Sequence, residues 1–123
     1  MIMGEKEDKE YYDEINKLNY DYLELFDSED DKQIYDELIG EILLDALDLK
    51  ITPKYREVDL YYYISKYSIF IYHFEQTENF EYCAEIRRMG IALLSDSFSR
   101  PRVEILEMFE VSINSFRESA NNM

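Results

Sequence analysis

Apolar side chains recur at helical spacing along most of this chain. Between residues 7 and 26 they are separated by four, three, four and three positions, which places them on one face of a helix. These residues are Tyr11, Ile15, Leu18, Tyr22 and Leu25. A second helix is predicted from about Glu29 to Asp48, with Ser28 as its N-cap. Its apolar side carries Ile34, Leu38, Ile42 and Ala46.

Residues 57–76 are rich in aromatic and β-branched side chains, so a strand over residues 67–74 is an alternative there. The segment runs for 20 residues without Gly or Pro, whereas strands usually run for about 4–8 residues. Its polar residues Asp59, Lys66 and His73 recur every seven positions, which is a helical period. The pattern therefore predicts a central helix that is buried on most sides.

The rest of the chain predicts two more helices. Thr77 is the expected N-cap of a helix over about residues 78–96. Ser99 is the expected N-cap of the last helix, with Pro101 in its first turn. The sequence thus predicts an all-α fold, a compact bundle of about five helices in a single domain over residues 1–123. The alternative is an α+β fold with a strand at residues 67–74.

Three segments are expected to lie outside the helices. Residues 27–31 and 49–56 are predicted loops, and residues 119–123 are a predicted frayed tail. Within the second loop, Thr52 as a cap and Pro53 as a first helical residue are an alternative start for the central helix.

Acidic residues far outnumber basic ones, and the formal net charge is −15 at pH 7. Residues 1–50 contain 17 Asp and Glu against 5 Lys, a net charge of −12, and residues 51–123 contain 11 against 8 Lys and Arg, a net charge of −3. Repulsion from phosphate argues against direct binding of DNA, RNA or anionic membranes. The charge predicts a basic protein surface as partner, or no partner.

The cysteine content and the apolar segments bear on the compartment. Cys83 is the only cysteine, so no intramolecular disulfide forms. No signal peptide is visible after Met1, and the longest apolar stretch, residues 60–74, is shorter than the roughly 20 residues of a membrane span. We therefore expect a cytoplasmic protein that makes no membrane contact.

The sequence offers little catalytic or ligand-binding equipment. Its one histidine, His73, and its one cysteine, Cys83, are expected to be packed side chains, with no third group to orient them as a pair. The acidic run at residues 27–31 lacks the central Gly and the alternating ligands of a calcium loop. No enzymatic activity, metal or cofactor is expected, with a carboxylate-based active site as the residual alternative.

Acidic side chains follow helical spacing in the first half of the chain. On the predicted helix over residues 29–48, four acidic residues form an expected outward stripe with no Lys or Arg inside it. They are Glu37, Glu41, Asp45 and Asp48. The full candidate partner-binding face consists of Glu10, Glu14, Tyr20, Asp21, Glu24, Asp30, Glu37, Glu41, Asp45 and Asp48. Each helix would carry one charge per ~5 Å, and two such helices side by side would carry one per ~3 Å. This approaches, without matching, the one charge per ~1.7 Å of duplex DNA.

These observations favour a small acidic inhibitor of the toxin-immunity or phage anti-defence type. Such a protein would cover the basic nucleic-acid-binding surface of a target enzyme, in one form by imitating the nucleic acid. The alternative is a helical adaptor or homo-oligomer, including a homodimer, with an aromatic interface. Its candidate residues are Tyr61, Tyr62, Tyr63 and Tyr67.

Overall fold

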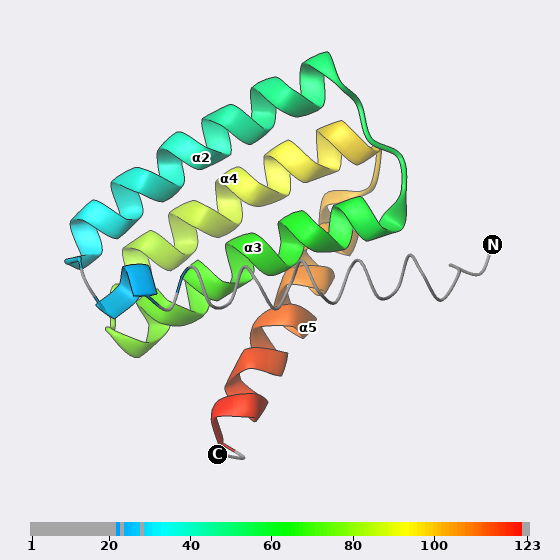
Figure 1. Ribbon diagram of the computed structural model, residues 1–123. Coiled ribbons are helices and arrows are strands. Elements are labelled where there is room, and N and C mark those ends of the chain that lie inside the picture. Colours follow the sequence, from blue (N-terminus) through cyan, green and yellow to red (C-terminus); the bar gives the residue numbers. More distant parts are fainter. Residues whose placement is uncertain (1–21, 23, 28, 122–123) are drawn as a thin grey trace.

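The fold is an all-α bundle, seen in a computed structural model that describes residues 22, 24–27 and 29–121 (Figure 1). Four long helices follow one another along the chain: α2 (Asp31–Ile51), α3 (Glu57–Gln76), α4 (Phe80–Phe98) and α5 (Arg102–Asn121). The described residues contain no strand, which confirms the all-α prediction and excludes the strand at residues 67–74. Tyr22 and residues 24–27 are also helical, while the rest of the helix predicted over residues 7–26 lies outside the described residues.

Helix α3 is the centre of the bundle. It packs against α4 and α5, and α2 packs against α4. Figure 1 shows α2, α3 and α4 running alongside one another, with α5 crossing behind α3 at a steep angle. More than half of the α3 side chains are buried, including the fully buried rings of Tyr67, Phe70 and Phe74. This burial on several sides overrides the β propensity of the segment.

The helix α2 starts two residues later than the sequence predicts. Asp30 is the N-cap: its side chain accepts a hydrogen bond from the Gln33 backbone N–H at 2.9 Å, and the Gln33 side chain accepts one from the Asp30 N–H. This reciprocal capping box satisfies two backbone donors, so Asp30 and not Ser28 begins the helix. Because Asp27 and Asp31 are helical, the predicted loop at residues 27–31 narrows in the described residues to Glu29 and Asp30.

The end of α2 lies further along the chain than predicted. The helix continues to Ile51, Thr52 is its C-cap, and the connection to α3 is only residues 52–56. Pro53 does not start a helix, since Arg56 is the N-cap of α3. A proline disfavours helical geometry in the residue before it, which explains why α2 ends at this point.

Two more predicted N-caps are C-caps. Thr77 ends α3, and Glu78 (φ 63°) reverses the chain so that the Asn79 N–H reaches the Phe74 carbonyl at 2.8 Å. Ser99 (φ 53°) ends α4 in the left-handed conformation, and α5 starts at Arg102. Ser and Thr signal a helix boundary, and here the left-handed turn closes the preceding helix. The helix α5 continues through Asn121, into the segment predicted to fray.

Candidate interaction surfaces

The acidic stripe predicted on α2 is divided between the interior and the surface. Asp45 is turned inward, with 17% of its side chain exposed, and its Oδ2 lies 3.1 Å from Lys66 Nζ. The hydroxyl of Tyr67 donates a hydrogen bond to the same carboxylate at 2.7 Å. The expectation of an outward stripe without a Lys or Arg partner is therefore wrong for Asp45.

Glu41 belongs to the same internal cluster. Its Oε2 lies 3.7 Å from Lys66 Nζ and accepts a hydrogen bond from the Tyr22 hydroxyl at 3.0 Å. Burial, together with Glu41, raises the pKa of Tyr22, and burial, together with Asp45, raises the pKa of Tyr67. Both phenols therefore stay neutral donors, and one buried ammonium compensates the two carboxylates.

Four members of the predicted acidic face remain at the surface of the described residues. They are Glu24, Asp30, Glu37 and Asp48. Glu10, Glu14, Tyr20 and Asp21 lie outside the described residues. Desolvation, a hydrogen bond with Glu29, and the charges of Glu29 and Glu41 raise the pKa of Glu37. This is the direction expected where carboxylates lie close to one another.

The outer side of α2 also carries large apolar side chains, which the sequence analysis did not single out. Leu43 and Leu44 are each 66% exposed, Leu47 is 54% exposed and Ile51 is 71% exposed. We call the surface made by Glu37, Gly40, Leu43, Leu44, Leu47, Asp48 and Ile51 the α2 outer face. A groove of about 710 Å³ runs beside it, lined by these leucines, Glu37 and Glu41 together with Tyr22, Leu25 and Phe70.

The aromatic residues predicted as an interface lie mostly in the core. Tyr67 is fully buried, and Tyr63 is 5% exposed and packs near Phe98 at 6.3 Å between ring centroids. Tyr61 and Tyr62 are half-buried, and Tyr62 packs edge-on against Tyr63. Tyr63 and Tyr67 are thus corrected from interface to core residues, because α4 and α5 cover the sides of α3 that bear them.

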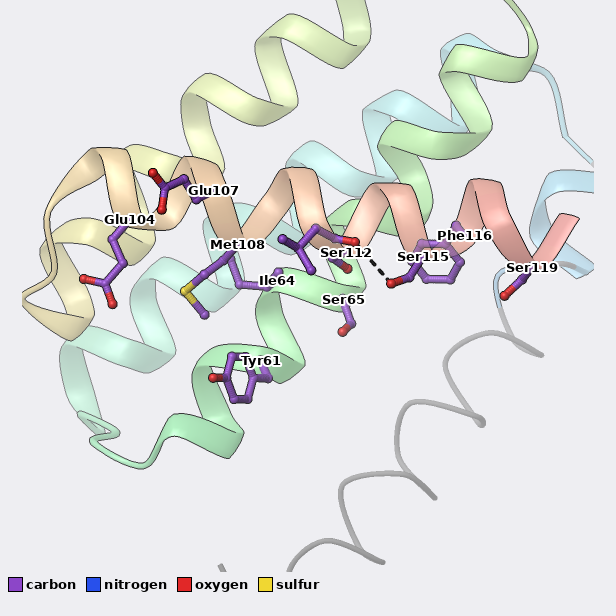
Figure 2. A pocket seen from close by; sticks show the side chains of 11 residues that line it. Tyr61, Ile64, Ser65, Glu104, Glu107, Met108, Ser112, Ser115, Phe116 and Ser119 are labelled. Carbon is purple, nitrogen blue, oxygen red and sulfur yellow. Dashed lines mark hydrogen bonds between the residues drawn. The ribbon is translucent and has the colours of Figure 1, made fainter. Parts of the chain in front are cut away.

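A second groove of about 590 Å³ lies between α3 and α5. Figure 2 shows Tyr61 and Ser65 of α3 facing Met108, Ser112 and Ser115 of α5 across it. The Ser115 hydroxyl donates to the Val111 carbonyl at 3.1 Å (Figure 2). Among the described residues that line this groove, none is a His, Cys, Lys or Arg, and its ionisable carboxylates are those of Glu104 and Glu107.

A polar junction joins α2, α3 and the α3–α4 turn. Asp31 Oδ1 lies 2.9 Å from His73 Nε2, and Asp31 Oδ2 accepts hydrogen bonds from Thr77 and Asn79. Burial alone would raise the pKa of Asp31, but these hydrogen bonds together outweigh burial and lower it. The His73 ring stacks on Phe26 at 4.1 Å between centroids. The junction therefore ties three elements of the fold together.

Cys83 and His73, which the sequence analysis weighs as a pair, contact different partners in the structure. The Cys83 thiol is 2% exposed and lies 3.3 Å from the Ile71 carbonyl oxygen, whereas His73 pairs with Asp31. Burial raises the pKa of Cys83, which opposes formation of the nucleophilic thiolate. The expectation of a non-enzymatic role stays a prediction.

Two other properties concern the described part of the chain. Its helices include none that combines the length and the apolar character needed to cross a membrane. Within the same residues, no group of three or more His, Cys, Asp and Glu side chains is arranged to hold a metal ion.

Comparison with known proteins adds no relative: no protein-family model, curated protein or solved structure matches this chain.

Proposed function

We propose that this protein is an inhibitor, of the toxin-immunity or phage anti-defence type, that binds another protein. Its target is a nucleic-acid-binding enzyme, and the inhibitor covers the basic surface that the enzyme uses for nucleic acid. The observation that carries the proposal is the α2 outer face, where exposed leucines lie beside carboxylates in a protein of net charge −15.

Solubility alone does not explain this surface. An acidic surface keeps a protein soluble, but four apolar side chains exposed by more than half on one helix work against solubility. Protein interfaces combine an apolar centre with a polar rim, and the α2 outer face has both. Complementary charge would steer a basic partner toward it and would oppose nucleic acid at the same place.

The division of the acidic stripe changes how inhibition would work. Of the four carboxylates in the stripe predicted on α2, only Glu37 and Asp48 are exposed. Eleven residues of helix separate them by ~16 Å, far from the ~1.7 Å charge spacing of duplex DNA. We therefore favour steric and electrostatic blockade of the basic surface over close imitation of phosphate spacing.

The test is affinity capture of partners from host lysate with tagged protein, eluted in steps of rising salt. Wild type and the double variant Glu37→Lys/Asp48→Lys are compared side by side, because reversing Glu41 or Asp45 would disrupt the internal Lys66 cluster as well. We expect wild type to capture a nucleic-acid-binding protein that salt releases and the variant to lose it, since charge attraction weakens as salt rises.

The matched control is Glu107→Lys/Glu118→Lys, which changes the net charge by the same amount at exposed positions of α5. It is expected to retain the partner. The purified partner should then bind nucleic acid, and the wild-type inhibitor should displace that nucleic acid. The proposal is contradicted if both double variants lose the partner equally. It is also contradicted if the partner keeps its nucleic acid while bound to the wild-type protein.

A further inference from the structure

The α2 outer face has the spacing of a helix-pairing seam. Glu37, Gly40, Leu44, Leu47 and Ile51 are separated by three, four, three and four residues. This 3–4 alternation is the a/d pattern by which one helix packs along another. The other apolar row of α2, at Ile34, Leu38 and Ile42, is buried in the bundle. In the part of the chain that the structure describes, the second apolar side, at Leu44, Leu47 and Ile51, stays more than half exposed.

The shape of the seam also suits a helix. A Cβ placed on Gly40 would meet no atom within 4 Å, whereas the next two seam positions carry Leu44 and Leu47. The seam therefore offers a recess at Gly40 beside projecting side chains, the alternation that receives the knobs of a facing helix. The groove along Leu43, Leu44 and Leu47 extends this recess toward Phe70.

The charges beside the seam select the kind of helix. Asp48 occupies a flanking e position and Glu37 occupies an a position, while Lys50 occupies a flanking g position at the end of the helix. Glu41, at the other e position, is already paired with Lys66. One oxygen of the nearby Glu29 is buried and has no hydrogen-bond partner among the described residues. Two copies of a chain with net charge −15 repel each other, whereas Lys and Arg beside the apolar residues of a partner helix would pair with Glu37 and Asp48.

We propose that the partner presents a basic amphipathic α-helix, which docks along the α2 seam with its apolar side on Leu44 and Leu47. This inference rests on the proposed function and specifies the part of the partner that is bound. The seam supplies apolar contact, and Glu37 and Asp48 supply the charge that selects a basic helix.

The test uses a designed peptide and needs no knowledge of the natural partner. The fluorescent probe peptide is about three heptads long, with Leu at positions a and d and Lys or Arg at e and g. Its binding to the full-length protein is followed by fluorescence anisotropy. We expect saturable binding that Leu44→Asp weakens at least ~10-fold, since an aspartate would place an unpaired charge in an apolar contact.

Two controls separate the seam from general charge attraction. Val103→Asp alters an exposed apolar residue of α5 and is expected to change the affinity less than ~2-fold, because surface changes away from a contact have little effect. A shuffled peptide of identical composition keeps the charge but has no apolar side, and it should bind at least ~10-fold more weakly. Equal binding of both peptides overturns the inference.

Other occupants of the seam give distinct results, and each overturns the inference. A second copy of the chain appears in sedimentation velocity as a dimer that Leu44→Asp dissociates. Occupation by residues 1–21 of the same chain appears as a lower unfolding midpoint for Leu44→Asp than for Val103→Asp, without any peptide. If the probe peptide fails to bind while partner capture still depends on Glu37 and Asp48, the proposed function stands and only the helical partner fails.

Discussion

Lys66 shows how one residue changes the interpretation of an acidic surface. Its side chain is only 8% exposed, and its Nζ lies 3.1 Å from an Asp45 oxygen and 3.7 Å from a Glu41 oxygen. Charge spacing along α2 predicted that both carboxylates faced outward. The sequence pattern of α2 does not show that a cation of another helix lies opposite them, because that depends on how α3 is rotated against α2.

Replacing Lys66 is expected to destabilise the fold strongly. Lys66→Met leaves Asp45 in the interior without its cation, and we expect the free energy of unfolding to fall by about 3 kcal/mol, the lower end for breaking a buried ion pair. Urea denaturation followed by circular dichroism measures this change. Adding Asp45→Asn to that variant should restore part of the loss, since the amide oxygen still accepts the hydrogen bond from Tyr67.

Lys50→Met is the matched control, because Lys50 is exposed in the last turn of α2. A change within about 0.5 kcal/mol is expected there, as for most surface substitutions. If Lys66→Met were as mild as Lys50→Met, the internal ion pairs would contribute little to the fold.

At the scale of elements, the sequence determined helix identity better than helix ends. The seven-residue recurrence of Asp59, Lys66 and His73 correctly predicted α3 as a helix. The sequence predicts Thr77 and Ser99 as N-caps, but they are the C-caps of α3 and α4. A hydroxyl residue marks a helix boundary without showing whether it ends one helix or begins the next. The left-handed backbone at Glu78 and Ser99 ends α3 and α4 at these points, and it follows from how tightly the chain must turn.

The α2 outer face illustrates a second limit at this scale. The sequence correctly placed Ile34, Leu38 and Ile42 in the core. It also contains Leu43, Leu44 and Leu47, and periodicity alone does not reveal which of two apolar sides is covered. Only the packing of α2 against its neighbours leaves these leucines outside the core.

The two mid-helix glycines of α2 and α4 are expected to respond oppositely to alanine. A Cβ on Gly90 would lie 2.9 Å from the Phe109 ring and 3.3 Å from the Tyr67 ring, so Gly90→Ala should destabilise the protein by about 1–3 kcal/mol. Gly40 has open space, so Gly40→Ala should stabilise α2 by up to about 1 kcal/mol through helix propensity. Thermal unfolding of both variants measures the two signs, and a stable Gly90→Ala would refute the close approach of α4 to α5.

The whole molecule carries a charge that acts against its own compactness. A net charge of −15 on 123 residues produces self-repulsion that favours the expanded chain. Exposed ion pairs such as Lys32–Asp36 and Arg88–Glu85 oppose it, but pairs on an exposed surface contribute little. Added salt screens both effects, and the Lys66 pairs are screened less because they are largely buried.

We therefore expect salt to stabilise the free protein, because screening removes more repulsion than attraction. The unfolding temperature should rise with NaCl as the Debye length shortens from ~30 Å at 0.01 M to ~8 Å at 0.15 M ionic strength. Glu107→Lys/Glu118→Lys changes the net charge from −15 to −11, by two units at each of two positions, and should show a smaller rise. A temperature that falls with salt would mean that surface ion pairs outweigh the repulsion. In that case repulsion among the acidic residues would not lower the stability of the free protein, and a basic partner would have no such repulsion to relieve.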